Sequence, residues 1–298
     1  MDSTQIDWWD DQEANWYRGN LHTHTSESDG RRSPEEACRW FHEHGYDFVQ
    51  LTDHMKVVSG EPYCSESFLA ITSCELHGAR SELGHPLHIL ALGLQEHVML
   101  EAEDDALTMV RKVREAGAEV IVAHPYWSGL TLNDLLPLED IIGIEVWNTT
   151  CSLLNGKGTS NAVWDDLLVR GRRLLGCAVD DAHWGRRDYG RGWILVKARE
   201  LTRDAILEAI RQRRFYSSTG PRILRMRLQD GRLHVSCSEV AAINLVCDAH
   251  NGRCVEADLG SLLTEAEFDL PEGVQYARVE CIDERGHAAW TNPLFASE

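Results

Sequence analysis

Two histidines separated by one residue lie in the stretch from Arg18 to Thr25. In an extended segment His22 and His24 would lie on the same face, about 6.5–7 Å apart along the backbone. Each metal–nitrogen bond spans about 2 Å, so both imidazoles could hold one ion. Asp29 follows on a turn that contains a glycine, where a third ligand could approach. We therefore expect a short strand here, carrying the first ligands of a metal site.

Histidines and acids also stand at the ends of several later apolar segments that read as strands. Strand ends are where α/β barrels and open sheets keep their active sites. Five strands that independently carried such a residue at one end by coincidence would be improbable. The pattern therefore favours one shared metal centre. The residues are Asp53 and His54 after 46–52, Glu75 after 69–74, His88 before 89–92, His124 after 120–123, and Asp180, Asp181 and His183 after 174–179.

A carboxylate that bridges two of these ions would create a hydrolytic centre. Two divalent ions about 3.5–4 Å apart lower the pKa of a shared water from 15.7 toward about 7, so a metal-bridging hydroxide exists at neutral pH. A serine or cysteine nucleophile is then unnecessary. Mixed histidine and carboxylate ligands suit Mn²⁺, Fe²⁺ and Zn²⁺ alike. The sequence thus predicts a centre of divalent ions without choosing the metal.

The segments between these residues alternate between strand-like and helical patterns. Ser33, Pro34 and two acids mark the start of one helix, and Gly45 marks its end. Strand and helix in alternation predict a parallel sheet or a barrel in the α/β class. We expect helices over 34–44, 102–116, 161–170 and 201–214, and strands over 46–52, 69–74, 89–92, 120–123, 142–147, 174–179 and 193–196.

After Pro221 the pattern changes to short alternating segments separated by turns. Such segments predict a small all-β, sandwich-like module of six or seven strands. The predicted domains are therefore 1–221, with every candidate ligand, and 222–298. The acidic, Trp-rich residues 1–17 read as a strap packed on the surface. The strand-like segments of the module are 223–228, 233–237, 243–247, 266–270 and 276–282.

Charge and cysteine usage narrow the class of protein. The chain has 29 Lys and Arg residues and 48 Asp and Glu residues. The resulting net charge of −19 argues against a surface that binds a long nucleic acid. No apolar run approaches the ~20 residues of a membrane span, and the N-terminus lacks a signal-peptide pattern. Nine scattered cysteines favour reduced, mostly buried thiols. We expect a cytoplasmic protein that acts on a small molecule, with its oligomeric state left open.

The ordered motifs His-x-His, Thr-Asp-His, Glu, His, Ala-His-Pro and Asp-x-His resemble the PHP (polymerase and histidinol phosphatase) family of metal-dependent hydrolases. Segments 16–24, 144–148 and 215–221 resemble its CehA/McbA-like branch, as does 289–293 near the C-terminus. The resemblance covers roughly residues 16–221. It implies a distorted (β/α)7-type PHP barrel, followed here by the β module.

The resemblance also implies which residues bind metal. The implied ligands are His22, His24, Glu75 and Asp181 for one ion, Glu75, His88 and His124 for a second, and Asp29, His54 and His183 for a third. Those implied to act in catalysis are His22, His24, Glu75, His124, Asp181 and His183.

Three neighbouring residues compete with this ligand set. His85 rivals His88, which leads directly into the apolar segment. Asp180 rivals Asp181, but only Asp181 has the Asp-x-His spacing. Asp53 reads as a carboxylate that orients a ligand.

The resemblance implies phosphoesterase activity, on mono- or diesters, as the leading function. We expect a small phosphorylated metabolite or nucleotide as the substrate. Arg186, Arg187 and Arg191 follow the Asp-x-His motif and could clamp a phosphate with forked hydrogen bonds. Asn148, at a strand end, could line the same site. Alternatives are hydrolysis of a carbamate, amide or carboxyl ester, as in the CehA/McbA type, and a non-catalytic metal-binding sensor.

Overall fold

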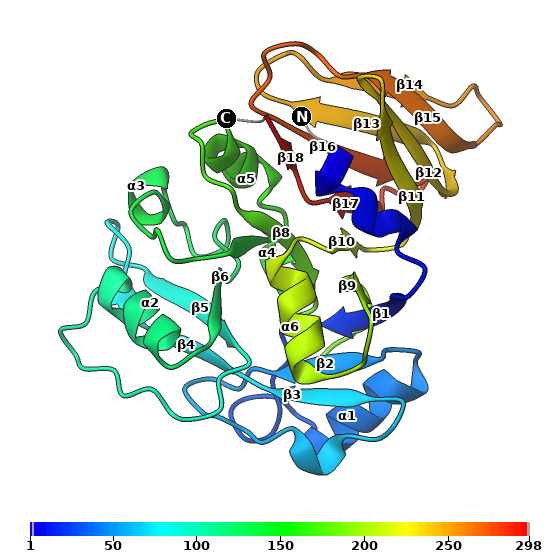
Figure 1. Ribbon diagram of the computed structural model, residues 1–298. Helices are drawn as coiled ribbons and strands as arrows, with labels where there is room; N and C mark the ends of the chain where they lie inside the picture. Colours follow the sequence, from blue (N-terminus) through cyan, green and yellow to red (C-terminus); the bar gives the residue numbers. More distant parts are fainter. Residues whose placement is uncertain (2, 297–298) are drawn as a thin grey trace.

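The computed structural model describes residue 1 and residues 3–296, which form a mixed α/β protein (Figure 1). The helices are η1 (Ser3–Gln5), η2 (Asp7–Asp10), α1 (Pro34–Glu43), η3 (Glu61–Tyr63), α2 (Ala106–Glu115), α3 (Leu132–Leu135), α4 (Thr149–Asn155), α5 (Asn161–Leu168) and α6 (Arg203–Arg211). The first ten strands are β1 (Asn15–Asn20), β2 (Phe48–Leu51), β3 (Leu69–Thr72), β4 (Cys74–Arg80), β5 (Pro86–Leu92), β6 (Glu119–Val122), β7 (Gly143–Asn148), β8 (Leu175–Val179), β9 (Trp193–Ala198) and β10 (Phe215–Ser218). The remaining strands are β11 (Ile223–Gln229), β12 (Arg232–Val240), β13 (Ala242–Cys247), β14 (Arg253–Glu256), β15 (Leu263–Asp269), β16 (Tyr276–Ile282), β17 (Ala288–Thr291) and β18 (Leu294–Phe295).

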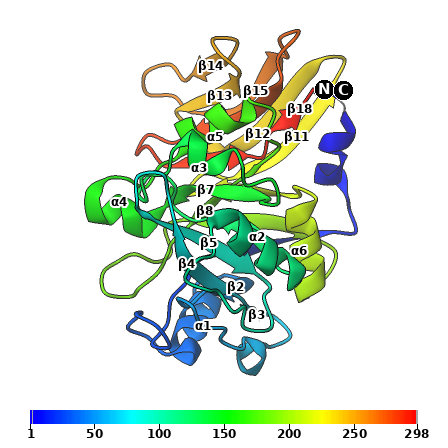
Figure 2. The ribbon, with the colours of Figure 1, turned by 90° about the vertical axis from the view of Figure 1, so that its left-hand side faces the viewer.

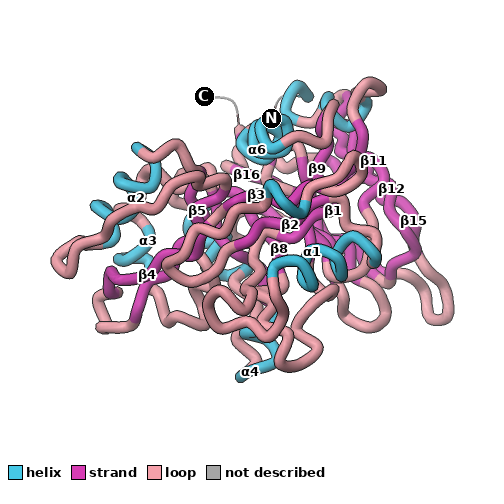
Figure 3. The backbone as a smooth tube through the Cα atoms, turned by 90° about the horizontal axis from the view of Figure 1, so that it is seen from below, coloured by secondary structure: helices cyan, strands magenta, loops and turns pink. Residues whose placement is uncertain are grey.

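The candidate ligands come from two sheets and the segments that adjoin them, and the view from below shows several of these strands (Figure 3). One contains β3-β2-β1-β9-β10, and the other has the order β4-β5-β6-β7-β8. β1 to β3 are mutually parallel, and so are β6 to β8. However, β5 runs antiparallel to both β4 and β6, and β9 runs antiparallel to β1.

The predicted (β/α)7-type barrel is therefore not confirmed, whereas the α/β class is. Only residues 81–85 connect β4 to β5. A parallel crossover needs a dozen or more residues, so this short link forces a hairpin. Between the two sheets the described residues make single bridges, Thr23 to Ala182 and His54 to Glu75.

Helix starts follow their capping residues closely. The Ser33 side chain accepts a hydrogen bond from the Glu36 amide, and the Glu36 side chain accepts one from the Ser33 amide. Together the two bonds form a capping box. Thr202 caps α6 with a single bond, which its side chain accepts from the Ala205 amide. α2 starts at Ala106, directly after its N-cap residue Asp105 and four residues later than predicted. Local side-chain chemistry thus sets these boundaries.

Two predicted strands end elsewhere than expected. β1 ends at Asn20, so His22 and His24 lie in an extended segment beyond it. The predicted strand 69–74 is split into β3 and β4, which places Glu75 at the start of a strand rather than after one. The Glu75 amide donates to the carbonyls of Thr52 and Asp53, so β4 begins across the end of β2.

The C-terminal strands lie together above the two sheets that carry the candidate ligands (Figures 1 and 2). β11, β12 and β15 form one sheet, while β13, β14, β16 and β17 extend the large sheet through pairing of β17 with β10. One apolar core is shared by both sheets and includes Met226, Leu233, Val235, Ile243, Leu245, Phe268 and Val279. A separate sandwich is not confirmed, because one of its sheets continues through β10 into the sheet that contains β9, β1, β2 and β3. The domain boundary near Pro221 stays a prediction.

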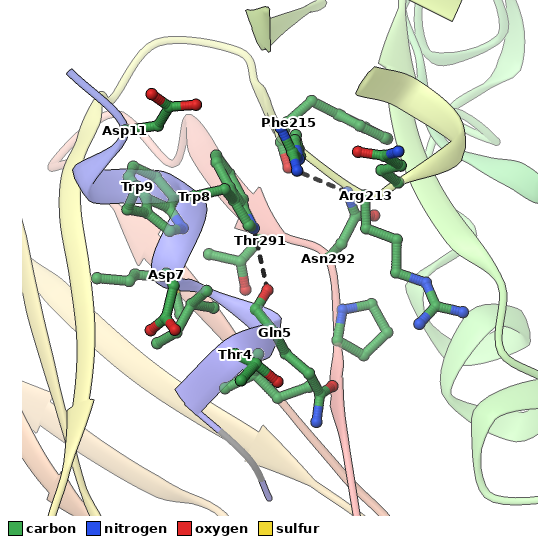
Figure 4. Close-up of a pocket in the computed structure, with 16 residues that line it drawn as sticks. Thr4, Gln5, Asp7, Trp8, Trp9, Asp11, Arg213, Phe215, Thr291 and Asn292 are labelled. Carbon is green, nitrogen blue, oxygen red and sulfur yellow. Dashed lines mark hydrogen bonds between the residues drawn. The ribbon is translucent and has the colours of Figure 1, made fainter. Parts of the chain in front are cut away.

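The N-terminal strap packs onto this module. Ile6 and Trp9 are buried in the module's apolar core. The Gln5 side chain exchanges two hydrogen bonds with the backbone of Phe295. A cavity of about 440 Å³ remains between the strap and the segments around Phe215 and Asn292 (Figure 4). The Trp-rich strap is therefore an integral part of the packing.

All nine cysteines are free, and seven of them are buried. Throughout residues 1 and 3–296, each helix is too short or too polar to span a bilayer. The cytoplasmic location stays a prediction.

Candidate metal centre

The structure brings all nine predicted ligands into one cluster at a cavity of about 420 Å³. His22 and His24 are fully buried at its base, whereas His54, His88 and His183 are partly exposed. Ligand atoms within 4.8 Å of one another form three overlapping groups: His22, His24 and Asp181; His54, Glu75 and His88; and His24, Asp29, His54 and His183.

Glu75 occupies the middle of the cluster. Its Oε2 lies 3.2 Å from Nε2 of both His22 and His24. Its Oε1 lies 2.8 Å from Nδ1 of His88 and 3.3 Å from Nε2 of His124. Oε2 also lies 3.0 Å from Nδ1 of His54, so the two carboxylate oxygens face two different sets of histidines, as a bridging ligand requires.

The other acids complete the cluster from opposite sides. Asp181 Oδ1 lies 3.2 Å from Nε2 of His22 and 3.0 Å from Nε2 of His24. Asp29 Oδ2 lies 3.3 Å from Nε2 of His183, while its Oδ1 lies 3.6 Å from Nδ1 of His24. His24 therefore faces the third group as well as the first, which the sequence did not indicate.

Four buried polar atoms in this cluster have no hydrogen-bond partner within the described residues. They are His24 Nδ1, His54 Nδ1, Glu75 Oε2 and Asp181 Oδ1. An unsatisfied buried polar group costs about 1–3 kcal/mol, and more when it is charged. These atoms are the kinds that bind Mn²⁺, Fe²⁺ or Zn²⁺, and all four belong to predicted ligands. The cluster therefore fits divalent cations.

Electrostatics in the cluster are dominated by pairing of imidazoles with carboxylates. Burial alone would lower the pKa of His24, but Asp181 and Glu75 outweigh burial and raise it to about 9. Burial opposes ionisation of Asp29, yet His183 and His24 lower its pKa to about 2. Without a cation, protons thus occupy nitrogen positions that a metal would use.

Loading the protein with Mn²⁺ is therefore expected to release protons. Because the pKa of His24 is about 9 in the metal-free protein, the ring is protonated below that pH and a metal must displace the proton. Apparent metal affinity should rise with pH and level off near pH 9. Calorimetric titration at pH 7 in two buffers of different ionisation enthalpy measures the release. Equal binding enthalpies in both buffers would contradict this expectation.

Two predicted ligands have strained backbone conformations. His124 has a φ of 30° and Asp181 a φ of 57°, both in the left-handed region. Non-glycine residues rarely adopt this region, and such outliers gather at functional sites. The Asp181 amide donates to the carbonyl of His22, and the His124 amide donates to Glu145, so hydrogen bonds hold both conformations.

Glu145 supports the cluster from behind, a role that sequence reasoning missed. Its Oε1 lies 2.6 Å from Nδ1 of His22, and its Oε2 accepts from the amide of His124 and from Nδ2 of Asn148. These bonds fix the ring of His22 with Nε2 toward the centre. Its position inside the apolar run of β7 was the available signal, because a buried acid there needs partners.

Glu145→Gln is expected to lower metal affinity and turnover by about 10–100-fold, the usual effect of changing a group that orients a ligand. The side-chain volume is retained, but the charge that holds His22 is lost. Metal titration and steady-state kinetics measure the two effects, with circular dichroism to verify folding. Unchanged metal affinity would show that Glu145 does not orient His22.

Asn148, predicted to line the substrate site, is buried behind it. Its Oδ1 accepts from the Cys151 amide and caps α4. Its Nδ2 donates to Glu145 and, at 3.1 Å, to Asp181 Oδ2. Both ends of the amide are therefore engaged, and Asn148 orients Asp181 instead of facing the cavity.

The three predicted phosphate-binding arginines separate in the structure. Arg186 lines the metal-centre cavity, whereas Arg191 lines a different one. Arg187 is exposed and lines neither. Asp180 explains the separation, because its carboxylate accepts the amides of three consecutive residues, 190 to 192, and turns the loop away.

Arg31 was missed by sequence reasoning, although it directly follows the Ser28-Asp29-Gly30 turn. It lines the metal-centre cavity together with Trp127 and Leu154. The cavity therefore combines two arginines with an apolar wall.

The rival residues lie outside the ligand groups. His85 is exposed, and Asp180 accepts the loop amides described above. Asp53 accepts from the amide and hydroxyl of Thr25 and from the hydroxyl of Ser28. It thus holds the loop that presents Asp29, consistent with an orienting role.

Comparisons with protein-family models and with curated proteins found no match. Among solved structures, a two-domain protein from Bacteroides vulgatus ATCC 8482, containing a predicted PHP-like metal-dependent phosphoesterase, has a TM-score of 0.56. It is 17% identical, and the match covers 95% of this chain and 96% of that chain.

Two further solved structures match at a TM-score of 0.45. One is a protein from Bifidobacterium adolescentis ATCC 15703 proposed to be a metal-dependent phosphoesterase, at 14% identity over 57% of this chain and 89% of that chain. The other is an amidohydrolase from Chromobacterium violaceum with bound sulfate and no metal, at 15% identity over 58% and 89%.

The likeness to the Bacteroides vulgatus protein extends over nearly the full length of both chains. It confirms the resemblance to PHP proteins at the level of the fold, whereas the CehA/McbA-like branch stays a prediction. The chain therefore has a PHP-like fold.

Proposed function

We propose that this protein is a metal-dependent hydrolase of small phosphate esters. The observation that carries the proposal is the set of four buried ligand atoms without partners, gathered around the bridging carboxylate of Glu75. The fold shared with a protein containing a predicted PHP-like metal-dependent phosphoesterase supports it.

The predicted ligands would hold two or three divalent ions, with Glu75 between the first two. Bound ions of this kind lower the pKa of water and stabilise negative charge that develops on the substrate. Glu145, Asn148 and Asp53 keep the ligands oriented, so little reorganisation is needed when substrate enters.

The cavity around the cluster suits a phosphate ester. Arg31 and Arg186 supply planar guanidinium groups that bind phosphate oxygens, while Trp127 and Leu154 offer an apolar wall to the organic part. Cys151 also lines the cavity, but burial raises the pKa of its thiol, so it stays protonated and does not act as the nucleophile.

Arg186→Ala is expected to lower kcat/KM for a phosphate ester by about tenfold or more, because a charge-assisted hydrogen bond contributes roughly 1.5–3 kcal/mol. The matched control is Arg187→Ala, on the same loop but outside the cavity, which should leave kcat/KM unchanged. Equal losses in both variants would contradict a specific role for Arg186.

A substrate panel tests the function directly. The Mn²⁺-loaded protein should release phosphate or alcohol from at least one phosphate mono- or diester. Turnover of aryl carbamates or carboxyl esters with none of the phosphates would instead assign carbamate or ester hydrolysis to the same centre.

A further inference from the structure

A second cavity, also of about 420 Å³, lies on the opposite face of α4 from the metal-centre cavity. Successive helical residues are about 100° apart, and Thr149, Ser152 and Leu153 line the second cavity while residues 150, 151 and 154 line the first. The full lining of the second cavity is Trp147, Thr149, Ser152, Leu153, Gly190, Arg191, Trp193, Thr219 and His287. The two cavities share no lining residue.

The second cavity has rigid aromatic walls. Trp290 stacks on Trp147 with ring centroids 6.5 Å apart and an interplanar angle of 24°. The indole N–H of Trp147 donates to Thr149 Oγ1 at 3.1 Å. The Arg18 guanidinium lies 3.9 Å from the centroid of the Trp193 ring. Both indoles that line the cavity are thus fixed in place, which lowers the entropic cost of stacking a flat ligand.

Arg191 brings a positive charge to this cavity. The Arg191 amide donates to Asp180 at 2.9 Å, so the backbone from which its side chain emerges is fixed. Among the described residues the Arg191 guanidinium has no ion pair, and no acid lines the cavity. His287 lines it as well and pairs through Nδ1 with Asp283, 2.9 Å away. In a chain of net charge −19, this local charge selects anions.

We propose that this cavity is a binding site, separate from the metal centre, for a small flat aromatic anion. The aromatic ring would lie between Trp147 and Trp193, and its carboxylate or phosphate would bind the Arg191 guanidinium. The volume lies within the usual range for small-molecule sites, about 300–1,000 Å³. His287 gives the C-terminal β module a part in this site.

Binding of indole-3-acetate tests the proposal without depending on turnover. Calorimetry uses the Mn²⁺-loaded full-length protein without added phosphate, which could itself bind Arg191. We expect one indole-3-acetate to bind, and indole-3-acetamide and cyclohexylacetate to bind at least about tenfold more weakly, because each lacks either the charge or the aromatic ring. Phenylphosphonate in a parallel titration distinguishes preference for a phosphate-type group from preference for a carboxylate.

Variants locate the site. Arg191→Ala should weaken the binding of the preferred probe by about 10–100-fold, the effect of one charge-assisted hydrogen bond. Arg187→Ala, an exposed change on the same loop, should leave it unchanged. The proposal is overturned if neither aromatic anion binds or if affinity survives Arg191→Ala. A failed substrate panel would leave these binding results unaffected.

Discussion

Glu75→Gln is expected to lower turnover by about a thousandfold or more and to remove most of the bound metal. Its two oxygens face separate sets of histidines, with contacts of 2.8–3.3 Å. Glutamine keeps the shape but offers a neutral oxygen and an N–H group, so it cannot bridge two cations. Losing several kcal/mol of charge stabilisation corresponds to about three powers of ten in rate.

Metal content by elemental analysis and kcat/KM on the best substrate measure the effect. His42→Ala is the matched control, because His42 lies on the surface of α1 and its ring pairs with Ser67 Oγ at 3.1 Å. It should change neither quantity. If Glu75→Gln retained full metal content and activity, the bridging assignment would be wrong.

Arg278→Ala is expected to destabilise the folded protein by about 3–5 kcal/mol, the usual result of removing one partner from a buried ion pair. The Arg278 side chain is 1% exposed and donates two hydrogen bonds, of 2.8 and 2.7 Å, to the Asp165 carboxylate. It also contacts Glu280 and lies over the ring of Trp164. The substitution leaves two partly exposed carboxylates, Asp165 and Glu280, without their cation and removes a contact between β16 and α5.

Urea unfolding measures this loss as a lower midpoint. The exposed pair of Arg39 and Glu35 on α1 provides the control, and Arg39→Ala should cost about 0.5 kcal/mol or less. A midpoint for Arg278→Ala equal to that of the control would show that the buried pair does not hold the C-terminal strands to the rest of the protein.

The sequence placed most of the clustered residues beside short apolar segments, and the resemblance to PHP proteins implied the full ligand set, including Asp29 on its turn. Strands in α/β proteins end at common edges, so polar residues at their ends converge even when the details of pairing are wrong. Glu75 illustrates this: the predicted strand boundary was incorrect, yet the residue lies in the centre of the cluster.

Other features depend on contacts between residues far apart in the sequence. Asp180 accepts the amides of residues 190–192, and this bonding decides that Arg191 faces a different cavity from Arg186. Glu145 has the periodicity of a buried strand position, and its partner His22 is 123 residues away. The apolar run around Glu145 indicates burial, but in neither case does a local pattern identify the partner. Strand direction was likewise misjudged at β5, where connection length was a better guide than hydrophobic periodicity.

The most direct test of the central claim is a crystal structure of the protein grown with Mn²⁺, with anomalous scattering measured at the manganese edge. We predict anomalous peaks about 2.0–2.3 Å from the ring nitrogens of His22 and His24, and from both carboxylate oxygens of Glu75. An absence of anomalous peaks among these residues, in crystals whose protein binds no stoichiometric metal in solution, would contradict the proposed metal centre.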